Sequence, residues 1–186
     1  MDDKVGLVTR FEDEFKNKVN HDIVDELMSE DFAHHQIVHS RKDADVSSIT
    51  DPEVHAFLTE GTRTGKLSFL SPSGRPLVTP VWFVVEDDTL VFNTGKDTAK
   101  GRALARDPRV SLCVDLEAPP YAFVQVQGAA KLSEDPDELV RTATAIAARY
   151  LGPERAEEFG KRNGVPGELV VRVRPVKVLA GFNMTG

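Results

Sequence analysis

Hydrophobic side chains recur at helical spacing near the start of the chain and again over several later segments. Residues 4–19 place an apolar side chain every three or four positions, and Asp22 can cap a short helix over 23–29. Asp51-Pro52 supplies the cap and first-turn proline of another helix, which Gly61 can end. The same signals predict three further helices: 99–106, capped by Asp97 or Thr98; 136–150, capped by Asp135; and 153–162.

From Lys66 onward, the pattern changes to short runs rich in Val, Phe and Thr, which is typical of strands, and the last run alternates apolar and basic residues. Tight turns such as Asp87-Asp88 separate these runs and favour antiparallel hairpins. Pro80 has no backbone N–H, so its strand is expected at a sheet edge or at a bulge. About six strands with few helices favour a closed or half-closed barrel over a sandwich. The predicted strands are 66–70, 75–86, 89–94, 109–116, 122–133 and 167–182.

Composition narrows the class of protein. The chain has 186 residues and a formal net charge of −7, which argues against non-specific binding to nucleic acid. No apolar run reaches the ~20 residues of a membrane span, and the acidic N-terminus is unlike a secretion signal. The single cysteine, Cys113, cannot form an internal disulfide, so we expect a cytoplasmic protein.

The charge is unevenly distributed along the chain, because residues 1–50 hold 12 acidic and 6 basic residues. We therefore divide the chain into an acidic helical extension with a linker (1–50) and a β-barrel domain (51–186).

A basic segment interrupts this acidic background. Residues 95–111, GKDTAKGRALARDPRVS, contain five cations: Lys96, Lys100, Arg102, Arg106 and Arg109. Cations in the first turn of a helix oppose its dipole, and they become favourable when an anion such as phosphate docks there. Arg106 suits the helix C-terminus, and Arg109 can pair with a neighbouring aspartate, so neither needs a ligand. The anion site would consist of Lys96, Thr98, Lys100 and Arg102. The alternative is an ordinary solvated helix face.

The same segment resembles the flavin-phosphate site of the pyridoxamine 5'-phosphate oxidase-like split β-barrel superfamily. The matching order is a strand ending in "FNT", a loop, Lys100, a short helix and then "DPRVSL". By position, the resemblance implies that Thr94, Thr98 and Lys100 belong to the cofactor-phosphate site. Ala99 stands where the family has an arginine, and Arg102 can supply a cation from the next turn. This departure favours a deazaflavin over FMN.

The wider core resembles the actinobacterial class B branch of the F420-dependent oxidoreductases. The likeness covers residues 51–182 and includes the runs "GRPLVTPVWFVVEDDTLVFNTGKDTAKGRALARDPRVSLCVD" and "PPYAFVQVQGAAKLSED". In that branch the deazaflavin cofactor F420 lies in a cleft between the two subunits of a homodimer. The resemblance therefore implies a six-stranded split β-barrel with flanking helices, F420 as cofactor and a homodimeric partner.

The resemblance also implies contacts to the cofactor ring. The strand from Arg75 to Trp82 matches the one that lines the ring, so Arg75, Thr79, Val81 and Trp82 are candidate contacts. Plain core packing is the alternative for Trp82. Gln127 shares a strand face with Gln125, and these amides either face solvent or reach the cofactor or substrate.

The predicted function is an oxidoreductase. Reduced F420 donates hydride, so the reaction would reduce a conjugated or quinone-like small molecule while the protein supplies orientation and a dry pocket. An FMN-dependent oxidase or reductase of the same fold is one alternative. A non-catalytic flavin, deazaflavin or haem carrier is another. No catalytic residue is assigned, because Tyr121, an arginine or water can each supply the proton.

The N-terminal extension carries a second resemblance. Residues 1–40 resemble the opening helices of the SnoaL-like family, but the sheet that should follow is missing. We expect the helix over 4–19 to pack on the barrel or across the dimer. His34, His35 and His39 are close in sequence but have no supporting cysteine, so no metal site is predicted.

Overall fold

The computed structural model describes residues 46–185. The chain divides into two units, Met1–Asp43 and Ala44–Gly186, and the described residues belong to the second. The predicted helices over 4–19 and 23–29, the SnoaL-like resemblance and the three clustered histidines lie outside the described residues.

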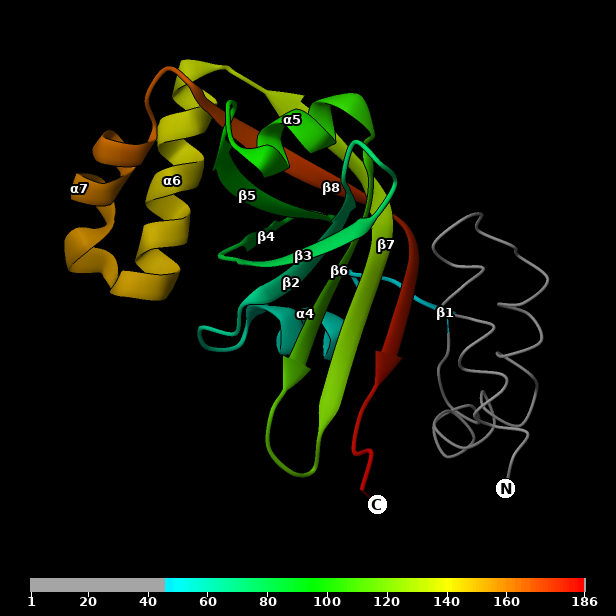
Figure 1. Cartoon of the computed structure of the whole chain (residues 1–186). Helices are drawn as coiled ribbons and strands as arrows, with labels where there is room; N and C mark the ends of the chain where they lie inside the picture. Colours follow the sequence, from blue (N-terminus) through cyan, green and yellow to red (C-terminus); the bar gives the residue numbers. More distant parts are fainter. Residues whose placement is uncertain (1–45, 186) are drawn as a thin grey trace. The chain divides into compact units, whose positions relative to one another are not determined.

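The described strands form one antiparallel sheet (Figure 1). Its order is β3-β2-β6-β7-β8-β5-β4, and the short β1 joins it by pairing with β8. The register of β7 against β8 shifts between Gln127 and Gly128, and such an irregularity bends a strand locally. The strands are β1 (Val46–Ser47), β2 (Gly65–Leu70), β3 (Pro76–Val81), β4 (Val84–Glu86), β5 (Thr89–Gly95), β6 (Arg109–Leu116), β7 (Ala122–Ser133) and β8 (Glu168–Gly181).

The two edges of this sheet are consecutive in the chain. β3 is one edge and β4 the other, and only Trp82 and Phe83 separate them. The described strands include no β3–β4 pairing, so the sheet curls but stays open at this corner. The predicted split barrel and the edge position of Pro80 are confirmed. The predicted strand over 75–86 is in fact two strands, because the chain crosses from one edge to the other in its middle.

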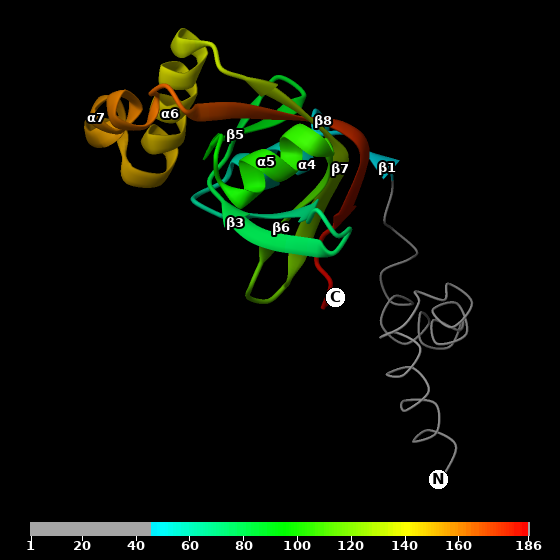
Figure 2. The ribbon, with the colours of Figure 1, turned by 45° about the horizontal axis from the view of Figure 1, so that its top comes forward.

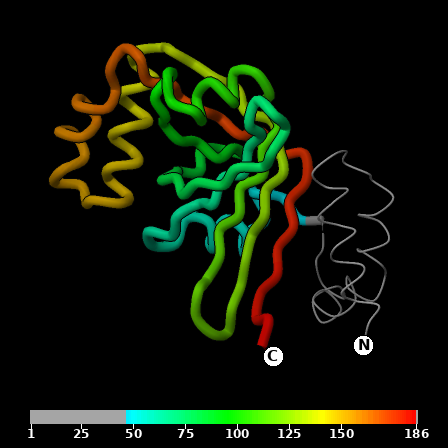
Figure 3. The backbone as a smooth tube through the Cα atoms, viewed as in Figure 1, coloured from blue at the N-terminus to red at the C-terminus, as the bar shows by residue number. Residues whose placement is uncertain are grey.

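The hydrophobic core fills the inside of the curled sheet, whose strands run side by side in the backbone trace (Figure 3). β2 alternates buried and half-buried residues along its whole length, as its sequence period predicts. Phe83 and Phe92 are both 0% exposed, and burying each side chain contributes roughly 1.5–3 kcal/mol. Ile49, 1% exposed, also belongs to this core, so the barrel begins inside the segment predicted to be a linker.

Helices flank the sheet where the caps predict them. Thr98 Oγ1 accepts a hydrogen bond from the Gly101 N–H at 3.0 Å, and Asp135 Oδ1 accepts one from the Glu138 N–H at 2.8 Å. None of the described helices has both the length and the apolar character needed to cross a membrane. The helices in this part of the chain are α4 (Pro52–Thr59), α5 (Ala99–Arg106), α6 (Pro136–Leu151) and α7 (Pro153–Asn163).

α6 and α7 form a helical hairpin at one end of the sheet (Figure 2). The two helices approach closely at Gly160, where an added Cβ would lie only 1.9 Å from Thr144 Oγ1. Arg172 on β8 attaches α6 to the barrel by binding Glu138 on α6 and Glu86 on β4, each at 2.7 Å. These contacts fix a helical wall beside the open corner of the barrel.

Candidate functional site

A cavity of about 360 Å³ opens between the helical hairpin and the open corner of the barrel. This volume lies within the range of small-molecule sites, roughly 300–1,000 Å³. Ala143, Ile146 and Ala147 of α6 give it an apolar wall, which Phe159 of α7 extends. The barrel side consists of the end of β3 with Trp82, and the polar lining residues are Asn93, Lys100, Asn163 and Glu168.

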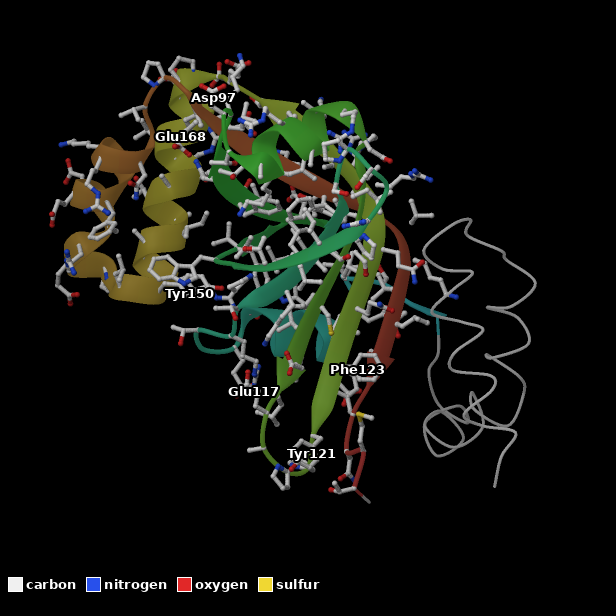
Figure 4. All side chains as sticks on the ribbon, viewed as in Figure 1. Asp97, Glu117, Tyr121, Phe123, Tyr150 and Glu168 are labelled. Carbon is white, nitrogen blue, oxygen red and sulfur yellow. The ribbon has the colours of Figure 1, made fainter. Side chains whose placement is uncertain are left out.

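Trp82 forms an aromatic border of the cavity. Its ring stacks on Tyr150 with the centroids 4.9 Å apart and the planes 3° from parallel, yet Trp82 remains 44% exposed. The Tyr150 hydroxyl donates to the carbonyl of Arg63 at 2.8 Å and accepts from the N–H of Phe83 at 3.3 Å, and burial raises its pKa. Tyr150 therefore stays neutral and holds Trp82 in place, with α6 as its support (Figure 4).

Lys100 brings a cation to the cavity lining. It lies in the first turn of α5, and its Nζ is 5.7 Å from the centroid of the buried Phe92 ring. Within residues 46–185 no carboxylate comes within ion-pair distance of it. Burial lowers the pKa of Lys100, and the more distant Glu168 carboxylate opposes that effect. A half-buried ammonium without a partner is a ready site for an anionic group.

Asn93 adds an amide with unused hydrogen-bonding capacity. It lies on β5 between the buried Phe92 and Thr94, and both its side-chain nitrogen and oxygen are buried without a partner in the described part of the chain. Leaving such a group unpaired costs about 1–3 kcal/mol. A bound molecule with both a donor and an acceptor at its edge would satisfy it.

Glu168 is the acidic member of the cavity lining. It begins β8 opposite Gly95 of β5, beside the helical hairpin (Figure 4). Burial raises the pKa of its carboxyl, and the Lys100 ammonium acts in the opposite direction. The cavity thus contains one unpaired cation and one unpaired acid.

The other cations of the basic segment have partners of their own. Lys96 Nζ pairs with Glu134 at 2.7 Å, and the Arg102 guanidinium donates to the backbone carbonyl of Asp97. Arg106 donates to the carbonyl of Leu70, as expected for a residue that needs no ligand.

Arg109 pairs with Asp107 rather than Asp115. The contact is 2.7 Å, and it lowers the pKa of Asp107 to about 2. The two threonines of the predicted phosphate site also have local partners. The Thr98 hydroxyl caps α5 and donates to the carbonyl of Gly95, while the buried Thr94 hydroxyl lies 3.3 Å from it.

The cavity brings together only part of the predicted cofactor set. Lys100, Val81 and Trp82 line it. Thr79 is half-buried on β3, Arg75 is exposed in the turn before that strand, and Gln127 is exposed on β7. The residues not on the lining are Arg75, Thr79, Thr94, Lys96, Thr98, Arg102 and Gln127.

Sequence reasoning missed Asn93 and Glu168 as lining residues. Asn93 had a signal, because it is a polar residue inside an otherwise buried strand end. Glu168 had none, since an acidic residue at a strand start is usually exposed. The described residues contain no cluster of side chains that could hold a metal ion.

The fold is that of a known family. Residues 50–180 match the family model of pyridoxamine 5'-phosphate oxidase (PNPOx_N), whereas no curated protein matches the chain. The chain therefore belongs to the pyridoxamine 5'-phosphate oxidase-like family, a family with oxidoreductase members whose fold binds flavin-type cofactors.

Solved structures share this fold. The conserved hypothetical protein Rv2991 from Mycobacterium tuberculosis is 26% identical, with a TM-score of 0.66 over 76% of this chain and 89% of that one. An F420 reductase is 23% identical, with a TM-score of 0.52 over 66% of this chain and 94% of its own. A heme-binding protein from Mycobacterium smegmatis is 25% identical, with a TM-score of 0.52, and the match covers 68% of this chain and 52% of that protein.

The cavity residues fit a flavin-type cofactor. Such a group combines an anionic phosphate, a flat ring and a polar ring edge. Lys100 offers an unpaired cation, Trp82 an aromatic border and Asn93 an unsatisfied amide, all on one cavity. The donor set therefore matches the chemistry of the group that the family binds.

Proposed function

We propose that this protein is an oxidoreductase that uses reduced F420 to transfer hydride to a conjugated or quinone-like small molecule. The supporting observation is that one cavity touches both Lys100 and the end of β3 with Trp82. From sequence these were two separate predictions, a phosphate site and a ring-lining strand. Their meeting on one cavity is what a single elongated cofactor with an anionic end requires.

The chain's own residues would bind and orient. The Lys100 ammonium and the N–H groups of Ala99 and Lys100, the first-turn donors of α5 that the Thr98 cap leaves free, would hold the phosphate. Asn93 would hydrogen-bond the polar ring edge, and the Trp82–Tyr150 stack would keep one border of the cavity rigid. The apolar wall of α6 would exclude water from the reacting atoms. When bound, a reduced deazaflavin supplies hydride to an electrophilic carbon.

Two features favour F420 over FMN in this proposal. Ala99 is exposed where the resembling oxidases have a phosphate-binding arginine. Arg102, the nearest alternative, is already bonded to the Asp97 carbonyl. Lys100 is therefore the one unpaired cation on the cavity lining. The phosphate site of the resembling FMN oxidases has an arginine as well as a lysine, and so carries more positive charge.

Titration of the full chain with F420 and with FMN tests the proposal. Trp82 is the only tryptophan of the chain and it lines the cavity, so its emission should be quenched as the cavity fills. We expect saturable quenching with F420 at lower concentration than with FMN. We also expect oxidation of reduced F420 in the presence of an enone or quinone. Tight FMN binding without an F420 response would refute the proposal, and F420 binding without turnover on any acceptor would favour a carrier.

We also propose that the functional unit is a cytoplasmic homodimer whose cofactor cavity lies at the subunit interface. The edge strand β3 exposes Leu77 (40%) and Val78 (67%) just before the cavity-lining Pro80–Trp82. Light scattering on the full chain should give twice the monomer mass of 20.5 kDa. Val78→Asp should shift the chain toward monomer and weaken F420 binding. A wild-type chain that is monomeric at micromolar concentration would contradict the dimer.

A further inference from the structure

Glu168 occupies a position between two cavities. It lines the main cavity of about 360 Å³ and also a smaller one of about 180 Å³. The smaller cavity lies between the start of α6 and the 164–167 turn, and its lining includes Glu134, whose side chain is 56% exposed. Glu168 is therefore bordered by the proposed reaction space on one side and by a route toward solvent on the other.

The Glu168 carboxyl lies close to Gly95 of the neighbouring strand. Glu168 pairs across the ladder with Gly95, and an added Cβ at Gly95 would lie 3.4 Å from Glu168 Oε1. Asn93 is two residues from Gly95 on β5, so its side chain shares the face of the ladder on which Glu168 lies. No hydrogen bond or ion pair to the Glu168 carboxyl occurs within residues 46–185.

The charged groups around Glu168 are few. Lys100 on α5 lines the main cavity together with it, and its ammonium opposes the rise that burial causes in the pKa of the Glu168 carboxyl. Across the smaller cavity lies Glu134, whose charge is balanced by its 2.7 Å pair with Lys96. Because Lys100 is not within ion-pair distance, Glu168 keeps an available carboxyl rather than being locked in a structural salt bridge.

Other proton donors are less well placed. Tyr121 is at the far end of the β6–β7 hairpin and does not line the main cavity (Figure 4). Both hydrogen-bonding directions of the Tyr150 hydroxyl are already used by backbone groups. Among the lining residues, Lys100 and Glu168 are the titratable ones, and Lys100 is the proposed phosphate ligand.

We propose that Glu168 is the catalytic acid of this site, and the inference rests on the proposed function. In the reduction of a conjugated enone, hydride brings two electrons to the β carbon. The Glu168 O–H bond then breaks and a C–H bond forms at the α carbon. The resulting carboxylate regains a proton from solvent through the smaller cavity. Hydride and proton together account for the two hydrogens of the product.

The direction of the pH dependence follows from this role. The acid acts while it is protonated, so kcat should fall as pH rises through the pKa of Glu168. Burial raises that pKa and Lys100 opposes the rise. Removing the carboxyl should therefore lower kcat and also abolish the fall of kcat with rising pH.

The experiment compares Glu168→Gln, Glu168→Asp and the control Glu157→Gln in the full chain. Glu157 is exposed on α7 and pairs with Lys161, away from the lining. Steady-state reduction of an enone by reduced F420 gives kcat, its pH profile and the solvent deuterium isotope effect. Trp82 quenching gives F420 affinity separately, and ¹³C NMR of the labelled carboxyl in the F420-loaded chain follows its protonation.

We expect Glu168→Gln to lower kcat by roughly 10²–10⁴-fold, the usual contribution of a general acid. F420 affinity should be unchanged or tighter, because the substitution removes a negative charge near Lys100. Glu168→Asp should restore part of the rate and the fall of kcat with rising pH, and the Glu157→Gln control should match wild type.

A Glu168→Gln chain that retains the wild-type rate and pH profile overturns the inference while leaving the F420 function standing. Weakened F420 binding by Glu168→Gln would also overturn it, in favour of a structural role. Failure of wild type to bind or oxidise reduced F420 removes the proposed function and this inference with it.

Discussion

Replacing Lys100 with alanine should weaken F420 binding by about 1.5–3 kcal/mol, or roughly 10- to 150-fold, the range for a lost charge-assisted hydrogen bond. Lys100 lines the cavity and has no ion-pair partner within residues 46–185. Its charge is therefore not already neutralised before the phosphate arrives. The dissociation constant follows from quenching of Trp82 emission or from F420 fluorescence.

Lys96→Ala is the matched control for Lys100→Ala. Lys96 is four residues earlier and equally cationic, but its ammonium is exposed and paired with Glu134. An exposed pair of this kind contributes little, about 0–1 kcal/mol, so the control should bind F420 within about threefold of wild type. Equal losses from the two substitutions would show that general charge attraction, rather than a defined phosphate contact, drives binding. An unchanged affinity for Lys100→Ala would remove Lys100 from the site.

The parts of the fold that could be predicted from the sequence are those that depend on interactions between residues close together in the chain. Helix starts at Thr98 and Asp135 depend on hydrogen bonds to residues only three positions away, so the sequence displays them directly. The split between β3 and β4 was missed, because the run Val81–Val85 is continuously apolar. Whether Phe83 continues a strand or turns into the core depends on the far edge of the sheet, which no local pattern specifies.

The candidate site shows the same contrast between local signals and tertiary contacts. Lys96, Lys100 and Arg102 look alike in sequence, and their roles differ because of tertiary partners. The carboxylate that binds Lys96 lies 38 positions away along the chain. Asn93 and Glu168 become lining residues only after the α6–α7 hairpin has closed the cavity beside them. Whether a polar residue lines the cavity depends on the tertiary packing that encloses the cavity. The hydrophobic period and the spacing of motifs along the sequence therefore could not identify Glu168.

Arg149 holds this enclosure together from the C-terminal end of α6. Its guanidinium donates to three backbone carbonyls: Leu58 at 2.7 Å, Phe83 at 2.8 Å and Gly61 at 3.0 Å. It also lies 4.5 Å from the centroid of the Phe83 ring. One planar group thus binds α6 to the end of α4 and to the crossing between the two sheet edges. A guanidinium can do this because its donors point outward in a fixed plane.

Replacing Arg149 with methionine should lower the free energy of unfolding by about 3 kcal/mol. Methionine keeps an apolar stem over Phe83 but leaves three carbonyls without their donor. Arg149→Lys should recover less than half of the loss, because an ammonium cannot reproduce the planar set of donors of the guanidinium.

Arg141→Met, exposed on the same helix, is the control and should change stability by under about 0.5 kcal/mol. Urea unfolding followed by Trp82 emission reports on this unit alone, since the chain has no other tryptophan. If Arg149→Met unfolds at the wild-type urea concentration, Tyr150 and Arg172 suffice to hold α6. In that case the cavity wall would not depend on the guanidinium contacts.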